Sequence, residues 1–401
     1  METMKYDVIV IGAGIQGAGV AQAAAAAGYS VLVLEQTAPA AGTSSKSSKL
    51  IHGGLRYLET AQFGLVRESL HERALLLRLA PELVKLQHLH IPVYSDSTRS
   101  PLTIRAGLSL YSVLSGFDRD ARFSRLAPKD WAELENLRLD GLKAVFRYQE
   151  AQTDDAALTR AVLHSAMQLG AEVQMPARFV GAVRNGQCCH VEFENTQGVQ
   201  TASCRVLVNC AGPWALDVLA RVTPRLRLPA IELVQGSHIL LPPLLKQYFY
   251  LEAPQDKRAV FVLPWQGQLM VGTTEKMHQG APEAAHCSDD ERNYLLKTLM
   301  HYFPDLTVPA DEVKTFAGLR VLPRSERTAF ARPREVMFNL DDEIRPRVLS
   351  VMGGKLTTYR ATALLALARL APSLPVTEAK ANTASLKLVP VSEAELMSCT
   401  V

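Results

Sequence analysis

The chain has 401 residues, about 2.7 times a typical ~150-residue domain, and this length predicts two or three domains. Hydrophobic residues make up 48% and charged residues 21% of it, so the chain can bury a large core and does not have the composition of a disordered or collagenous protein. The formal net charge of +3 is too small to predict nucleic acid as a partner.

The first 35 residues have the pattern of a nucleotide-binding βαβ unit. A buried strand is predicted over 6–11, an alanine-rich helix to about residue 27 and a second buried strand over 30–34. Gly12, Gly14 and Gly17 follow the first strand, and Glu35 ends the second. The glycines allow a tight turn, close approach of a pyrophosphate and close helix–strand packing, and the acid accepts hydrogen bonds from a ribose. A glycine-rich turn without a ligand would leave Glu35 unexplained, so we predict a dinucleotide site.

The middle of the chain alternates helical and strand patterns. Helices are predicted over 60–87, as one or two amphipathic segments, and over 154–169, with Thr153 or Asp154 as the N-cap. Residues 95–140 lack long periodicity apart from 104–114, and are predicted to leave the nucleotide-binding fold. Short strands are predicted over 172–174, 178–183, 189–193 and 201–208. The last of them leads to a small-residue turn at Ala211 and Gly212, against which a flat ligand can lie.

The second half of the chain predicts a separate sheet and then a return to the first fold. Long strands of a mainly antiparallel sheet are predicted over 231–241 and 259–274, with a helix over 289–303 beside them. A strand over 347–352 then meets Gly353 and Gly354, and a helix follows over 356–370. We therefore predict an α/β fold in which a Rossmann-type domain is discontinuous in sequence and carries an inserted, mainly antiparallel α+β substrate domain. The predicted ranges are 1–90, 140–215 and 315–371 for the dinucleotide-binding domain, 91–139 and 216–314 for the substrate or cap domain, and 372–401 for a C-terminal tail.

Cysteine spacing and the N-terminus bear on the compartment. The six cysteines form no CxxC pair and no regular ladder, so we predict neither a metal site nor a disulfide framework. The first residues run into a strand without the basic start and cleavage site of a signal peptide, and no apolar run reaches the ~18 residues that a spanning helix needs. We expect a cytoplasmic protein whose membrane contact is at most peripheral.

A longer set of motifs resembles the FAD-dependent glycerol-3-phosphate dehydrogenases. Residues 42–59 read GTSSKSSKLIHGGLRYLE, and the further motifs are QGSH at 235–238, GTTE at 272–275, AGLR at 317–320 and GGKLTTYR at 353–360. With the N-terminal βαβ unit, the resemblance spans roughly residues 5–370 in the family's order. The family more often has Arg at position 46, Lys at 235 and Asp at 275, where this chain has Lys46, Gln235 and Glu275.

The resemblance implies FAD as the cofactor, bound without a covalent link. Gly353 and Gly354 before a helix suit the side of the flavin ring that becomes anionic. We expect hydrogen bonds to the pyrophosphate or the ring from Thr43, Ser44 and Ser48. The alternative for any one of them is a polar loop residue that contacts no ligand. The full predicted FAD-binding set is Gly12, Gly14, Gly17, Glu35, Thr43, Ser44, Ser48, Leu50, Val180, Ala211, Gly212, Gly353, Gly354 and Leu356.

The resemblance also implies glycerol 3-phosphate as the substrate, with a hydride passing from its C2 to the flavin. His238 is the expected base, since histidine titrates near working pH, with His52 as its rival. Arg320 and Lys355 complete the predicted catalytic set.

The predicted substrate-binding residues are Arg56, Tyr57, Thr274 and Arg332. The alternative for Tyr57 is a core aromatic residue. Arg320 and Arg332 belong to a cation-rich stretch over 314–335, which suits phosphate because guanidinium groups bind it through two hydrogen bonds. Arg324, Arg327 and Arg334 in the same stretch are expected to be solvated.

The resemblance favours a quinone as the electron acceptor, reached by peripheral docking at the inner face of the cytoplasmic membrane, with oxygen as the alternative. The aerobic bacterial members usually continue into a C-terminal helical domain, whereas this chain ends soon after the GGK motif, as compact oxidases do. Two other functions fit parts of the sequence: a flavoprotein that binds FAD without turnover, and an NAD-dependent dehydrogenase, which the first 35 residues alone would permit. The retained Arg56, His238, Arg320 and Lys355 favour the enzyme, and the late GGK motif favours FAD.

Overall fold

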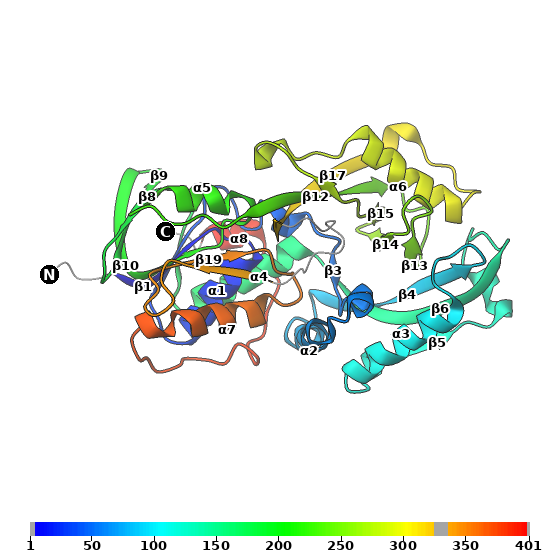
Figure 1. Cartoon of the computed structure of the whole chain (residues 1–401), viewed down its shortest axis with the longest axis horizontal. Helices are drawn as coiled ribbons and strands as arrows, with labels where there is room; N and C mark the ends of the chain where they lie inside the picture. Colours follow the sequence, from blue (N-terminus) through cyan, green and yellow to red (C-terminus); the bar gives the residue numbers. More distant parts are fainter. Residues whose placement is uncertain (1–4, 325–335, 399–401) are drawn as a thin grey trace.

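The computed structural model describes residues 5–324 and 336–398. These residues form two sheets, one of nine and one of ten strands. Figure 1 shows them as two lobes: β1, β10 and β19 lie in one, and β4, β6 and β13 in the other, with β12 and β17 running from one lobe toward the other. The predicted α/β fold, with a Rossmann-type sheet and a second, mainly antiparallel sheet, is confirmed.

The first sheet is built around the predicted βαβ unit. β1 (Tyr6–Ile11) pairs in parallel with β2 (Val31–Leu34) and β10 (Gly198–Asn209), and β10 pairs in parallel with β19 (Val348–Met352). The central parts of these strands, at 8–11, 31–34 and 206–208, are buried apolar runs because both faces of the sheet are covered there. Outer strands are β7 (Glu172–Gln174), β8 (Ala177–Arg184), β9 (Cys189–Asn195), β11 (Val222–Thr223) and β18 (Met337–Leu340).

Helices cover one face of this sheet. Side chains of α1 (Ile15–Ala26), α4 (Asp155–Gln168) and α7 (Tyr359–Leu370) share one core with Val8 and Val10 of β1. Ile9 and Ile11 point to the other face and pack with β8 and β9, as the alternation of a strand requires. The short α5 (Ala215–Ala220) follows β10. The sheet therefore presents the carboxyl ends of β1, β2 and β10 at one edge, where Gly12, Glu35 and Ala211 lie.

The second sheet carries the remaining motifs. Its order is β16-β12-β15-β14-β13-β4-β6-β3, with β17 on β12 and β5 on β6, and its pairs are antiparallel except β13 with β4. The bounds are β3 Leu50–Ile51, β4 Val84–Tyr94, β5 Phe123–Arg125, β6 Leu142–Thr153, β12 Ile231–Leu241, β13 Tyr248–Glu252, β14 Ala259–Trp265, β15 Gln268–Gly272, β16 Lys276–Met277 and β17 Lys314–Pro323. α6 (Asp289–Tyr302) packs on one face and α3 (Pro101–Leu114) on the other.

Several elements differ from the sequence-based expectation. The helix expected over 60–87 is α2 (Phe63–Leu79), and β4 begins at Val84. Pro81 explains the stop, because the residue before a proline is disfavoured in the helical conformation. The helix expected from residue 356 begins at Tyr359. The segment expected as a tail buries Leu388, Val391 and Leu396 in the core of the first lobe and ends in α8 (Glu393–Ser398).

Several strands lie in a different sheet from the one that their predicted domain range implies. β3 and most of β4, from the range 1–90, pair in the second sheet, and β11, from the range 216–314, pairs in the first. The ranges 140–215 and 315–371 were assigned to the dinucleotide-binding domain, yet β6 and most of β17 fall within them and pair in the second sheet. β6 pairs with β4 along most of its length, and β17 pairs with β12 from Lys314 to Pro323. The division into domains stays a prediction, but its boundaries do not follow the two sheets.

Candidate active site

One large cavity brings most of the predicted site residues together. It has a volume of about 880 Å³ and is lined by residues of both sheets. The predicted residues that line it are Gly12, Gly14, Glu35, Thr43, Ser44, Ser48, Leu50, Arg56, Tyr57, Ala211, Gly212, His238, Arg320, Gly353, Gly354, Lys355 and Leu356. Segments from both ends of the chain thus meet around one space.

One end of the cavity has the geometry of a dinucleotide site. Glu35 is 8% exposed, and its carboxylate accepts hydrogen bonds from the backbone N of Ala13 at 2.8 Å and of Thr37 at 2.9 Å. Gly12 has a φ of +97°, which a residue with a side chain rarely adopts. A Cβ on Gly17 would lie 1.9 Å from the carbonyl oxygen of Gly12. Gly17 therefore does not line the cavity but lets α1 pack against the turn, as the fingerprint predicts.

The loop after β2 is fixed to both lobes. Ser44 Oγ accepts from the backbone N of Ile15 at 2.9 Å, at the start of α1. Thr43 donates to the carbonyl oxygen of Leu319 on β17 at 2.8 Å. Behind them, Lys49 Nζ lies 2.6 Å from Asp155 Oδ1, and both side chains are buried. The loop is thereby held between the nucleotide end of the cavity and β17.

His238 lies on β12 at the other end of the cavity. Its ring is 2% exposed, stacks on Phe316 at 4.8 Å between centroids, and places Nε2 2.9 Å from Ser48 Oγ. Burial, with the cations of Arg320 and Lys49, lowers the pKa of His238 from 6.5 to about 3. The imidazole is therefore neutral at physiological pH. Its pKa lies well below the working range for which histidine was expected as the base, so the ring in the unliganded protein is a weaker base than a free imidazole. Ser48, predicted for FAD, is here a hydrogen-bond partner of the predicted base.

Cationic side chains surround the same end. Arg320 on β17 donates to Thr273 Oγ1 at 3.2 Å and lies 3.7 Å from a carboxylate oxygen of Glu275. Lys355 Nζ lies 4.1 Å from the ring centroid of Tyr57, and the Arg56 guanidinium 5.2 Å from it. Tyr57 is 5% exposed and lines the cavity, so it is both a core aromatic residue and part of the wall.

His52, the rival base, also lines the cavity. Its backbone N donates to Thr357 Oγ1 at 3.2 Å, which ties the HGG segment to the turn before α7. The role of His52 as a rival base stays a prediction.

Some predicted residues do not line the cavity. Thr274 is buried behind the wall, where its hydroxyl donates to Glu291 Oε1 at 2.6 Å and accepts from the backbone N of Ser237 at 2.9 Å. Thr273 faces the cavity instead, because neighbouring residues of an extended chain point to opposite sides. Val180 is replaced in the lining by its neighbour Phe179. Arg332, with Arg327 and Arg334, lies outside the described residues.

Sequence reasoning missed other residues of the lining. Gln16 and Gln36 line the nucleotide end, directly after the first glycines and after Glu35, where the fingerprint could have pointed to them. Arg258 and Glu150 also line the cavity. Arg258 lies just before β14, outside every motif, and its place in the lining follows only from the fold. Within residues 5–324 and 336–398, no group of three or more His, Cys, Asp or Glu side chains could hold a metal ion.

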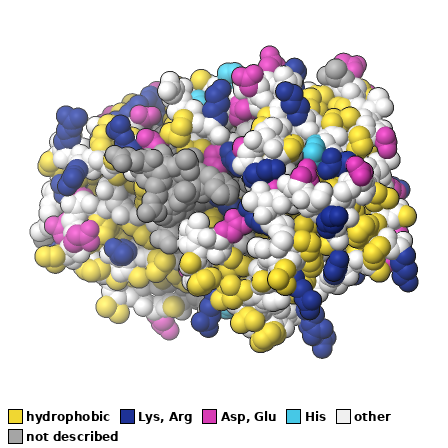
Figure 2. All heavy atoms as spheres, turned by 45° about the vertical axis from the view of Figure 1, so that its right-hand side comes forward, with side chains coloured by type: hydrophobic (Ala, Val, Ile, Leu, Met, Phe, Trp, Pro, Cys, Tyr) yellow, Lys and Arg dark blue, Asp and Glu magenta, His cyan; other side chains and the backbone are white. Residues whose placement is uncertain are grey.

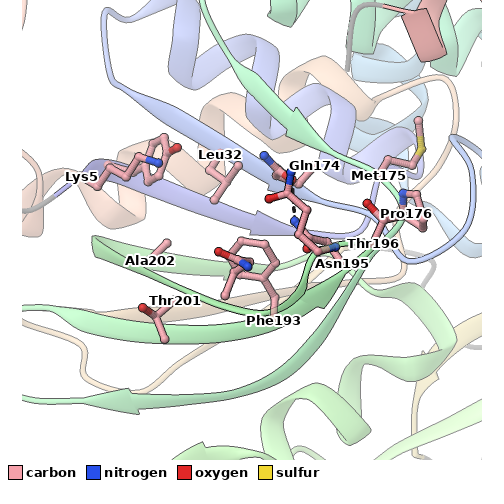
Figure 3. Close-up of a pocket in the computed structure, with 13 residues that line it drawn as sticks. Lys5, Leu32, Gln174, Met175, Pro176, Phe193, Asn195, Thr196, Thr201 and Ala202 are labelled. Carbon is pink, nitrogen blue, oxygen red and sulfur yellow. Dashed lines mark hydrogen bonds between the residues drawn. The ribbon is translucent and has the colours of Figure 1, made fainter. Parts of the chain in front are cut away.

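A second cavity, of about 310 Å³, lies against the first sheet, away from these residues (Figure 3). Asn195 and Gln174 are hydrogen-bonded in its wall at 3.3 Å, and Lys5, Thr201 and Phe193 also line it. It contains none of the predicted site residues.

The large cavity fits a flavin dinucleotide on its own geometry. The first turn of α1 faces it through Gly14, Ile15 and Gln16, which brings the positive end of the helix dipole toward a pyrophosphate. Within the described chain, the side-chain oxygen of Gln16 is buried and has no hydrogen-bond partner. The glycine turn at 353–354 lies in the same wall.

Comparison with known proteins decides the family. The model of a family described as "FAD dependent oxidoreductase" matches residues 7–360. The chain belongs to this family. Its cofactor is therefore FAD, and it is an oxidoreductase.

The comparisons also confirm the resemblance stated above. The glycerol-3-phosphate dehydrogenase of Pseudomonas aeruginosa is 38% identical, with 92% of this chain and 72% of that protein covered. The D-erythritol 1-phosphate dehydrogenase of Brucella abortus is 36% identical, with 93% and 75% covered. Among solved structures, the glycerol-3-phosphate dehydrogenase of Bacillus halodurans, complexed with FAD, has a TM-score of 0.75 and 27% identity, with 98% of this chain and 69% of that chain covered.

Proposed function

We propose that this flavoenzyme oxidises sn-glycerol 3-phosphate to dihydroxyacetone phosphate and passes the electrons to a quinone. The observation that carries the proposal is the placement of His238, Arg56, Arg320 and Lys355 at one end of a cavity whose other end has the geometry of a dinucleotide site. A neutral imidazole and several cations suit an alcohol that also carries a phosphate. The relatives named for glycerol 3-phosphate support the same substrate.

In this proposal the residues at the nucleotide end hold FAD. Gly14 and the start of α1 receive the pyrophosphate, Glu35 the ribose, and Gly353 and Gly354 the flavin. Thr43, Ser44 and Ser48 adjoin these groups. When bound, FAD supplies the acceptor for a hydride from an alcohol carbon.

At the other end, His238 takes the proton of the C2 hydroxyl as the C–H bond gives up its hydride, so that a carbonyl forms. Ser48 orients the ring through Nε2. Arg320 and Arg56 bind the phosphate, with Arg332 as a further partner expected from the motif. Lys355 stabilises negative charge that develops on the substrate or on the reduced cofactor.

We further propose peripheral contact with the inner face of the cytoplasmic membrane, where a quinone is accessible. α3 supports this, since Leu102 is 76%, Val113 50% and the following Phe117 70% exposed. The neighbouring Arg105, Arg119, Arg122 and Arg125 are exposed as well. In Figure 2, hydrophobic side chains lie beside Lys and Arg side chains along the lower part of the face. An exposed apolar helix face bordered by cations suits an anionic lipid surface. No helix in the described part of the chain is long and apolar enough to cross a membrane.

The test is an anaerobic titration of the purified yellow protein with glycerol 3-phosphate, followed by reoxidation. Loss of the oxidised flavin absorption is expected with glycerol 3-phosphate and not with glycerol. Faster reduction by erythritol 1-phosphate would move the substrate to the longer polyol phosphate, for which the Brucella relative is named. Reoxidation should be much faster with a soluble quinone than with air-saturated buffer. Stoichiometric hydrogen peroxide at full turnover rate would make the enzyme an oxidase, and no reduction by any polyol phosphate would contradict the proposal.

A further inference from the structure

Arg258 lies on the wall of the same cavity end as Arg320. It directly precedes β14, whereas Arg320 belongs to β17, and both side chains line the cavity. In the second sheet, β15 and β12 lie between these two strands. The two guanidinium groups thus come from separate strands that the sheet brings to one place.

A single buried carboxylate joins the two arginines. Glu275, whose side chain is 2% exposed, forms a close ion pair with Arg258 through Oε2 and lies 3.7 Å from Arg320 through Oε1. Arg258 also donates to the backbone oxygen of Glu275 at 3.4 Å. Glu275 accepts a hydrogen bond from the Arg258 guanidinium, which orients that planar fork, and its charge attracts the Arg320 guanidinium at 3.7 Å.

The arginines keep access to the cavity while Glu275 does not. Their side chains are 17% and 24% exposed, against 2% for Glu275, and Glu275 is absent from the cavity lining. The cavity therefore meets the cationic side of this cluster. His238 and Thr273 lie in the same wall, so an anion held here would lie beside the proposed reaction centre.

We propose that Arg258 binds the phosphate of the substrate together with Arg320, and that Glu275 is the positioning residue that holds both guanidinium groups in place. This inference deepens the proposed function and rests on it. It assigns a substrate role to a residue outside the family motifs. The competing role for Arg258 is a purely structural tie between β14 and the turn at 273–275.

The experiment compares holoenzyme variants Arg258→Gln and Arg258→Lys with Arg292→Gln as a matched control. Arg292 is an exposed arginine of α6 that also pairs with a carboxylate, Asp289. Anaerobic rapid mixing gives the dissociation constant of glycerol 3-phosphate and the limiting rate of flavin reduction. Calorimetric titration of the same holoenzymes with inorganic phosphate gives a second binding constant that needs no turnover.

We expect Arg258→Gln to raise both dissociation constants by roughly 10- to 100-fold, the usual effect of losing a hydrogen bond between charged groups. The limiting rate and the FAD content should stay close to the wild-type values. Arg258→Lys should have dissociation constants between those of the wild type and Arg258→Gln. Glu275→Gln should raise the same constants, and combined with Arg258→Gln it should add less than the sum of the single effects.

Unchanged constants in Arg258→Gln would overturn the inference, and so would an equal rise in Arg292→Gln. A drop in FAD content or limiting rate without weaker phosphate binding would show that Arg258 is only a structural tie. If glycerol 3-phosphate fails to reduce the wild-type flavin, the proposed function fails. The phosphate titration then still decides whether Arg258 binds an anion.

Discussion

Replacing His238 by glutamine is expected to slow flavin reduction by glycerol 3-phosphate by about 100- to 10,000-fold, the usual contribution of a general base. This corresponds to about 3–5 kcal/mol in the activation free energy. Glutamine fills much of the same volume and retains a polar end near Ser48, which lies 2.9 Å from Nε2 in the native protein. The loss should therefore reflect proton transfer more than disrupted packing.

The pH dependence follows from the environment of the ring. Burial and the nearby cations lower the pKa of His238 to about 3, so the free enzyme loses the neutral base only near that pH. The profile of kcat/KM should accordingly show no acid limb from this residue above about pH 4. A substrate phosphate beside Arg320 offsets one of the cations that lower the pKa, so the limb in the enzyme–substrate complex should lie at higher pH than in the free enzyme.

The assay is anaerobic rapid mixing with the flavin absorption as signal. His90→Gln is the matched control, because His90 is 9% exposed, has a pKa lowered to about 4 chiefly by burial, and lies on β4 outside the lining of the large cavity. His90→Gln should reduce the flavin at the wild-type rate. A wild-type rate in His238→Gln, or equal losses in both variants, would refute the role of His238 as the base.

Three further outcomes are expected. Gly14→Val should abolish FAD retention, because an added Cβ would lie 3.0 Å from Ser44 Oγ and the valine methyl groups would fill the approach of the pyrophosphate. Gly186→Val is the control, since no atom lies within 4 Å of an added Cβ there, and it should keep the flavin, as measured by absorbance. Asp155→Asn should lower the free energy of unfolding in urea by about 3–5 kcal/mol, since it leaves Lys49 buried without its charged partner; a change below ~1 kcal/mol would mean that the pair is not buried in solution. Lowering the pH from 6.5 toward 4 should reduce the free energy of unfolding, because the folded pKa values of His90, about 4, and His238, about 3, lie below the ordinary value of 6.5. The unfolded chain then binds protons that the folded chain does not, which gives a slope of up to ~1.4 kcal/mol per pH unit for each histidine. In urea unfolding over this range, the double variant His90→Gln/His238→Gln should show a shallower slope.

Local order in the sequence was enough to predict the nucleotide-binding unit. A buried strand, a glycine turn, a helix and an acid at the end of the next strand are neighbours in the chain. Their conformations depend mainly on each other, and Gly12 and Glu35 lie where the pattern places them. The GGK turn and the HGG segment could be assigned to the same cavity because their motifs resemble those of a known family, and the cavity lining includes both.

The partners of the site residues depended on the tertiary structure. Sheet pairing, which joins residues far apart in the chain, determines that Ser48 meets His238, that Thr273 rather than Thr274 faces the cavity, and that β6 belongs to the second sheet. Arg258 and Arg320 are 62 positions apart in the sequence, and only the order β14-β15-β12-β17 brings them to one carboxylate. A strand pattern shows that alternate side chains share a face, but the register with its neighbours decides which face meets the substrate.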